Sequence, residues 1–131
     1  MYTLPMTLLI LAFCGLLGVF SRYAVDLYIS RYTGPFPVGT LLINLAGAFI
    51  AAVVFVASVE RQLLSYEWRT GLIVGFCGGF TTFSAYALQT LVQWEAGEKS
   101  LALLYFVGSP VLGLACAYAG LQFGRLIFSA T

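Results

Sequence analysis

The sequence contains no histidine and little charge. Of its 131 residues, six are Lys or Arg and five are Asp or Glu. The charged fraction of 8% is far below the roughly one quarter that soluble domains carry. Without histidine, the chain lacks the commonest protein ligand for haem and zinc and the commonest general base. We therefore do not expect an enzyme.

Cysteine is also sparse. Cys14, Cys77 and Cys116 are odd in number, lie in apolar stretches and show none of the paired spacings typical of metal sites. We interpret all three as small core residues.

Apolar sequence dominates the chain, at 61% of residues with 16% aromatic. This composition predicts an integral membrane protein, and the chain can hold about four spans of roughly 20 residues. Runs bounded by charge, proline or glycine predict helices at 7–29, 38–59, 70–94 and 100–128, with turns at 34–37, 60–69 and 95–99. The predicted fold is all-α, a single transmembrane domain over 1–131. We interpret the first helix as retained, because it lacks the pattern of a cleaved signal peptide.

Tryptophans and basic residues mark the ends of the predicted spans. Trp68 and Trp94 flank the third span, as amphipathic rings do at the two membrane interfaces. Four spans place both termini on one side, so Arg61, Arg69 and Arg125 share that side, whereas Arg22, Arg31 and Lys99 lie toward the other. Because an asymmetry of Lys and Arg sets orientation, we infer insertion in both orientations and pairing of two antiparallel copies about a two-fold axis. The alternative is a weakly oriented chain held by a partner subunit.

The third predicted span contains an unusual run of glycines and hydroxyls, Gly75-Phe76-Cys77-Gly78-Gly79-Phe80-Thr81-Thr82-Phe83-Ser84. No charged residue lies between Thr70 and Trp94. A helix broken at membrane depth is tolerated only where it is buried in protein or lines a cavity. The run therefore indicates an ion or substrate site.

Polar side chains recur on one face of three predicted spans. The second span has Thr40 and Asn44, and the fourth has Tyr105 and Ser109 on the same face as Gly113. In the third span, Thr81, Thr82 and Ser84 crowd the break, and Phe83, Tyr86 and Thr90 recur at helical spacing on one face just after it. None of the three spans carries a carboxylate near its middle. Hydroxyl and amide donors can replace part of the water shell of an anion, so the pattern favours an anion pathway. Two structural alternatives stay open, in which Asn44 only bridges helices and the aromatic pair only packs the core.

Other features also allow a structural interpretation. Pro110 cannot donate to the carbonyl of Phe106, which leaves that group free or kinks the helix. Arg22 and Asp26 form either an exposed ion pair or part of an electropositive pore mouth. Small residues at helical spacing indicate close packing of helices: Gly47, Ala51, Gly113, Ala117, Gly120 and Gly124.

Three motifs resemble the CrcB, or Fluc, family of fluoride channels. They are Gly15-x-x-Gly18-x-x-x-Arg22-Tyr23, Gly39-Thr40-x-x-x-Asn44-x-x-Gly47, and the run from Gly75 to Ser84, of which the last is the most specific. The resemblance covers the whole chain. It implies a dual-topology antiparallel homodimer with two pores, and a structural sodium ion at its centre bound by the backbone carbonyls of Gly78 and Thr81.

The same resemblance implies a fluoride pathway. The family's pore phenylalanines correspond to Phe83 and Tyr86, where tyrosine replaces the usual phenylalanine. Asn44 corresponds to the pore asparagine, Tyr105 and Ser109 to the polar track of the last helix, and Arg22 to the vestibule arginine. From their place at the break, we also expect Thr82 and Ser84 to belong to this pathway. The expected function is passive, selective export of fluoride across the bacterial inner membrane. The expected partners are fluoride, lipid and a second copy, with no nucleic acid.

Two other functions compete with a channel. A dual-topology exporter exchanging protons for cationic drugs would need a carboxylate within a membrane helix, for which Asp26 is the only candidate. A non-transporting assembly subunit would explain the small-residue stripes but not the glycine and hydroxyl run.

Overall fold

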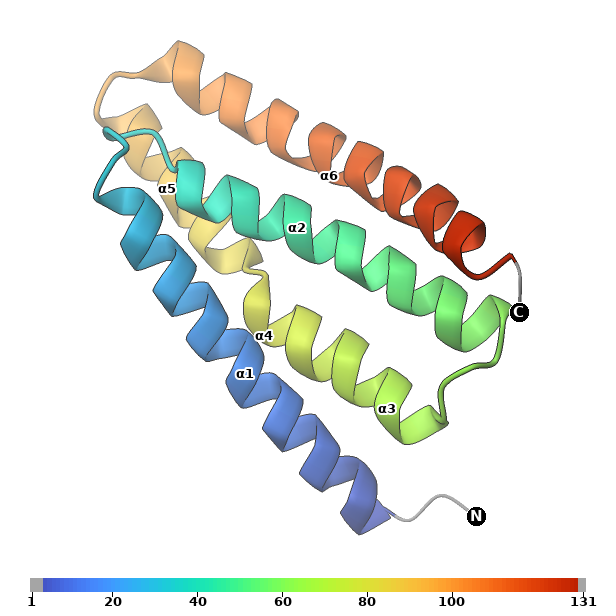
Figure 1. Cartoon of the computed structure of the whole chain (residues 1–131). Helices are drawn as coiled ribbons and strands as arrows, with labels where there is room; N and C mark the ends of the chain where they lie inside the picture. Colours follow the sequence, from blue (N-terminus) through green and yellow to red (C-terminus); the bar gives the residue numbers. More distant parts are fainter. Residues whose placement is uncertain (1–3, 130–131) are drawn as a thin grey trace.

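A computed structural model describes residues 4–129 as four membrane-length helical spans and short turns (Figure 1). The first span is α1, Leu4–Ser30, and the last is α6, Lys99–Ile127. The second consists of α2, Val38–Phe55, and the π-helical turn η1, Val56–Glu60. The third joins α3 (Tyr66–Thr70), π-helical η2 (Gly71–Cys77), α4 (Gly78–Phe80) and α5 (Phe83–Glu95). The prediction of an all-α protein with four transmembrane helices is confirmed.

The third span begins four residues earlier than predicted, at Tyr66. Ser65 is extended and precedes α3, and Glu67 lies in the first turn of that helix, where the helix dipole favours negative charge. Polar residues at a membrane interface can remain helical because water still solvates them. Trp68 is therefore inside α3 rather than in a loop, and the predicted turn at 60–69 shortens to 61–65.

The spans pack as two close pairs. α1 contacts mainly η2 and α4, whereas α2 contacts mainly α6. In Figure 1 the start of α1, the end of α6 and the turn at 61–65 lie at one end of the bundle, opposite the turns at 31–37 and 96–98. Three of the six basic residues consequently lie toward each end, as the sequence predicts.

Glycine allows both pairs to approach closely. A methyl group on Gly79 would lie 2.7 Å from the Gly15 carbonyl oxygen, and one on Gly75 would lie 2.8 Å from the Leu11 carbonyl oxygen. In the other pair, a methyl group on Gly120 would lie 2.9 Å from the Cβ of Ala52. These glycines serve helix contact. Gly113 differs from its predicted role in packing, because nothing lies within 4 Å of the position a methyl group would take.

Most large apolar side chains face outward. The interior is small, and its largest fully buried side chains are Tyr105, Ile43 and Val56. An apolar exterior around a small core is what a lipid environment requires. Cys14 and Cys77 are buried and Cys116 is half-buried, with all three thiols free, which confirms the first two as core residues.

Candidate functional site

The third span is interrupted at Thr81 and Thr82. Thr81 has ψ 160° and Thr82 has φ −149° and ψ 112°, so both residues are extended between α4 and α5. The hydroxyl of Thr82 accepts a hydrogen bond from the Ala85 N–H at 3.2 Å and begins α5 as its N-cap. The predicted break exists and lies near the end of the glycine and hydroxyl run.

Asn44 of α2 holds this break. Its Oδ1 accepts a hydrogen bond from the Thr82 N–H at 2.8 Å, and its Nδ2 donates to the Thr82 carbonyl at 3.1 Å. The side chain thus satisfies both backbone groups of an extended residue in the middle of the span. Asn44 is an interhelical bridge, and since Nδ2 carries two hydrogens, one N–H remains for a further acceptor.

The break separates the backbone carbonyls of residues 78–81 from their helical donors, and those of Gly78 and Thr81 are two of these four. In an uninterrupted helix, the Thr82 N–H would donate to Gly78 and the Ala85 N–H would donate to Thr81. Here the first donates to Asn44 and the second to the Thr82 hydroxyl. The carbonyls of Gly78 and Thr81 are therefore available to another ligand.

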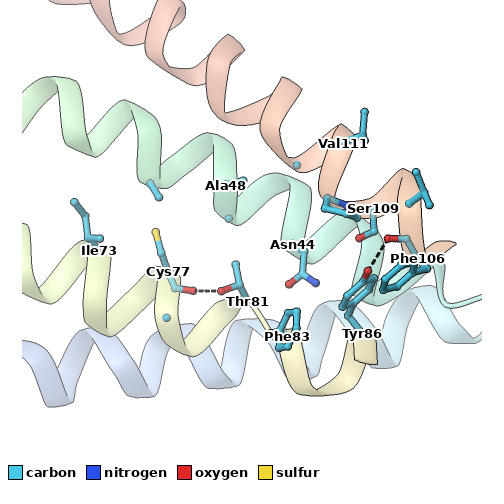
Figure 2. A pocket seen from close by; sticks show the side chains of 16 residues that line it. Asn44, Ala48, Ile73, Cys77, Thr81, Phe83, Tyr86, Phe106, Ser109 and Val111 are labelled. Atoms are coloured by element: carbon cyan, nitrogen blue, oxygen red, sulfur yellow. Dashed lines mark hydrogen bonds between the residues drawn. The ribbon is translucent and has the colours of Figure 1, made fainter. Parts of the chain in front are cut away.

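A cavity of about 860 Å³ lies beside the break, between α2, η2, the start of α5 and the middle of α6 (Figure 2). Six residues predicted for ion binding line it together: Asn44, Gly78, Thr81, Phe83, Tyr86 and Ser109. No acidic or basic side chain is among the lining residues. The other predicted residues, Thr82, Ser84, Tyr105 and Arg22, do not line this cavity.

Two aromatic rings stand at one wall of the cavity. The side chain of Phe83 is 79% exposed in the single chain, and its ring centroid lies 5.6 Å from that of Tyr86. The Tyr86 hydroxyl donates a hydrogen bond to the Phe106 carbonyl at 2.6 Å, the dashed contact at the right of Figure 2. This is the carbonyl that lacks a helical donor because of Pro110. Sequence reasoning identified the orphaned carbonyl but not its partner.

A part-buried polar network packs against Tyr86. The Tyr105 hydroxyl donates to the Gln89 Oε1 at 3.1 Å, and the Gln89 Nε2 donates to the Thr40 hydroxyl at 2.9 Å. Tyr105 is only 1% exposed, and its ring meets that of Tyr86 edge to face at 5.2 Å. Sequence reasoning missed Gln89, although an amide in the long charge-free stretch of the third span, three residues after Tyr86, was a usable signal.

Most hydroxyls near the cavity already have partners. The Thr81 hydroxyl donates to the Cys77 carbonyl at 2.8 Å, and the hydroxyls of Thr82 and Ser84 bond to each other at 3.2 Å. Ser109 differs, because it is buried, lines the cavity and makes no side-chain hydrogen bond within residues 4–129. Among the described side chains that line the cavity, the donors left for an anion are thus the Ser109 hydroxyl and the remaining N–H of Asn44.

Arg22 and Asp26 do not pair with each other. The one ion pair found in the described part of the chain joins Arg125 to Glu60 at 2.6 Å, at the opposite end of the bundle. Asp26 lines a second cavity of about 220 Å³ beside the turn at 31–37, and Arg22 lines neither cavity. The i to i+4 ion pair that was one interpretation of these residues is absent.

Comparison with known proteins gives consistent matches over nearly the whole chain. Residues 9–121 match the family described as CrcB-like protein, Camphor Resistance (CrcB). The chain is 43% identical over 123 residues to the fluoride-specific ion channel FluC of Paracoccus denitrificans, covering 94% of this chain and 98% of that protein. It is 40% identical to the protein of that name from Chlorobium phaeobacteroides, covering 91% and 93% of the two chains. The corresponding protein of Geobacter metallireducens is 35% identical, with 92% and 98% covered.

Proposed function

This chain belongs to the CrcB family, and on that basis we propose that it is a fluoride channel of the bacterial cell membrane that exports cytoplasmic fluoride passively. Its function is transport rather than catalysis. An interior-negative potential drives the anion outward by about 2.3 kcal/mol per charge for each 100 mV. No chemical fuel is required, and export of this kind gives fluoride resistance.

The observation that carries the proposal is the chemistry of the larger cavity. Its wall has hydrogen-bond donors at Ser109 and Asn44, the aromatic rings of Phe83 and Tyr86, and no carboxylate. Aromatic ring edges are electropositive, and hydroxyl and amide donors can replace water around a small anion. The side chains of Asn44, Phe83, Tyr86 and Ser109 are the proposed fluoride contacts.

The remaining pathway residues act around these contacts. Thr82 and Ser84 hold the start of α5, and Tyr105 supports the ring of Tyr86 from behind. Arg22, near the far end of α1, would act on the anion through its charge rather than by contact.

We further propose that two oppositely oriented copies form the working channel. The equal division of basic residues between the two ends supports insertion in both orientations. The exposed ring of Phe83 supports pairing, since a second copy placed over this face would cover it and close the cavity into a pore. An isologous antiparallel pair needs only this one chain.

A sodium ion at the centre of such a dimer would bind the carbonyls of Gly78 and Thr81. The fit is chemical: sodium prefers oxygen ligands, and both carbonyls have lost their helical donors. No cluster of three or more Cys, Asp or Glu side chains suited to a metal occurs in residues 4–129, so the ligands would come from the backbone. When bound, the ion supplies a positive charge that holds the two breaks together.

The exporter alternative is less well supported. It needs a membrane-embedded carboxylate that trades a proton for a cation, whereas Asp26 is exposed and lies outside the larger cavity.

The test is transport by the purified protein in liposomes loaded with fluoride or chloride. A potassium ionophore sets the potential, and ion-selective electrodes follow the efflux. We expect rapid fluoride release with chloride retained. Folded protein that releases no fluoride would refute the channel, and proton-coupled cation uptake lost in Asp26→Asn would establish the exporter instead.

A further inference from the structure

Tyr86 of α5 and Pro110 of α6 both line the larger cavity, and a hydrogen bond joins the two helices there. Proline has no N–H, so the helical hydrogen bond from residue 110 to the Phe106 carbonyl cannot form in α6. The Tyr86 hydroxyl, from α5, donates to that carbonyl at 2.6 Å (Figure 2). One helix therefore supplies the donor that the other lacks.

The bond determines what Tyr86 can offer an anion. A tyrosine hydroxyl has a single hydrogen, and here it belongs to the Phe106 carbonyl. The ring is 8% exposed, lies edge to face with Tyr105 at 5.2 Å and stacks near Phe106 at 6.5 Å. Tyr86 thus presents its ring to the cavity, while its hydroxyl is held in the wall.

The same bond changes what α6 presents. Phe106 and Pro110 both line the cavity, so without the hydroxyl the Phe106 carbonyl would be an unpaired acceptor beside the anion pathway. An unpaired carbonyl attracts cations and repels anions, and burying it without a partner is unfavourable.

We propose that the hydroxyl of Tyr86 has a positioning role: it caps the carbonyl left unpaired by Pro110, so that the fluoride pathway meets a fixed aromatic ring and no unpaired acceptor. This inference rests on the proposed fluoride function. The hydroxyl is the group that distinguishes tyrosine from phenylalanine at this position. In this proposal it bonds the Phe106 carbonyl in the wall of the pathway and does not contact the ion.

A double-substitution cycle tests the proposal. Tyr86→Phe removes the cap and should lower fluoride efflux roughly tenfold, together with the thermal midpoint of the purified protein. Pro110→Ala restores an N–H that can bond the Phe106 carbonyl within α6. In a Pro110→Ala background, Tyr86→Phe should therefore change fluoride efflux and the thermal midpoint by less than about a third of its effect in the native background.

Tyr118→Phe on α6 is the matched control, since Tyr118 is 65% exposed and lines neither cavity. It should leave efflux and midpoint unchanged. If Tyr86→Phe lowered fluoride efflux and the thermal midpoint equally in both backgrounds, the capping role would be refuted. It would also be refuted if Tyr86→Phe left the thermal midpoint of the otherwise native protein unchanged. Absence of fluoride efflux from the unsubstituted protein would instead refute the channel, and the cycle of midpoints would still decide whether the bond exists.

Discussion

The side-chain amide of Asn44 and the backbone of Thr82 form a two-bond pair, with Oδ1 accepting at 2.8 Å and Nδ2 donating at 3.1 Å. Thr82 is extended and has no neighbouring strand or helical turn to bond its backbone groups. The Asn44 amide takes the place of such a partner. The interruption of the third span is thus fixed by the second span.

We predict that Asn44→Ala lowers both stability and transport. The substitution leaves the Thr82 N–H and carbonyl unpaired, which should reduce the free energy of unfolding by about 1–3 kcal/mol, and it removes an anion donor. Thermal unfolding and fluoride efflux would be measured on the same preparation. Ala48→Ser, one turn along the same cavity, is the control and should change stability by less than about 0.5 kcal/mol. Native stability in Asn44→Ala would contradict the bridge.

Ser109→Ala separates transport from folding. The Ser109 hydroxyl has no partner within the described residues, so its loss should barely alter stability while lowering fluoride efflux roughly tenfold. Ser109→Thr should restore part of the flux. The matched control is Ser58→Ala, because Ser58 is buried but its hydroxyl donates to the Val54 carbonyl at 2.7 Å. Full flux through Ser109→Ala would remove this hydroxyl from the pathway.

Phe83→Ile tests the aromatic contact. Isoleucine keeps apolar bulk but lacks an electropositive ring edge, so fluoride efflux should fall while the protein remains folded and paired. Size-exclusion chromatography would check pairing alongside the efflux assay. Phe13→Ile on α1, also an exposed phenylalanine, should have no effect on either. If Phe83→Ile conducts normally, the ring is not an ion contact.

Removal of sodium tests the carbonyl site. Exchange of sodium for a large organic cation at constant ionic strength should weaken the dimer, by about 2.7 kcal/mol if the reference sodium concentration is 100 times Kd. The dimer fraction and fluoride flux would be followed as sodium is restored. Indifference of both to sodium would exclude Gly78 and Thr81 as ligands.

Gly79→Ala should disturb the contact between α1 and the broken span. The new methyl group would meet the Gly15 carbonyl oxygen at 2.7 Å, so the helices must shift, at a cost of about 1–3 kcal/mol. Gly108→Ala is the control, since nothing lies within 4 Å of its added methyl group. Alanine is also the better helix former there, so this control should be neutral or slightly stabilising. Equal effects of the two substitutions would mean that close approach is unimportant.

Composition and breaker residues predicted the four spans, because the length of a membrane helix is set by the bilayer. The break was expected within the run from Gly75 to Ser84, but its position depends on Asn44, which is 38 residues from Thr82 in sequence. A pairing over that distance cannot be read from local propensity.

The donor that reaches the Phe106 carbonyl shows the same limit. Pro110 predicts that the carbonyl four residues earlier, on Phe106, lacks its helical donor. Which group donates to that carbonyl instead depends on how α5 packs against α6. Gln89 joins two helices for the same reason, through Thr40 and Tyr105. Sequence reasoning located polar residues, and packing decided which of them bond to one another.

The two ends of the bundle carry three basic residues each. The attraction of a single Lys or Arg near a membrane surface to anionic lipid is worth about 1 kcal/mol. With three basic residues at each end, this attraction favours neither orientation of the chain. One substitution that adds or removes a basic residue at either end, far from every helix contact and every cavity residue, would make one orientation favoured. Such a substitution would change the orientation that the chain prefers in the membrane without altering a helix contact or a residue that lines either cavity.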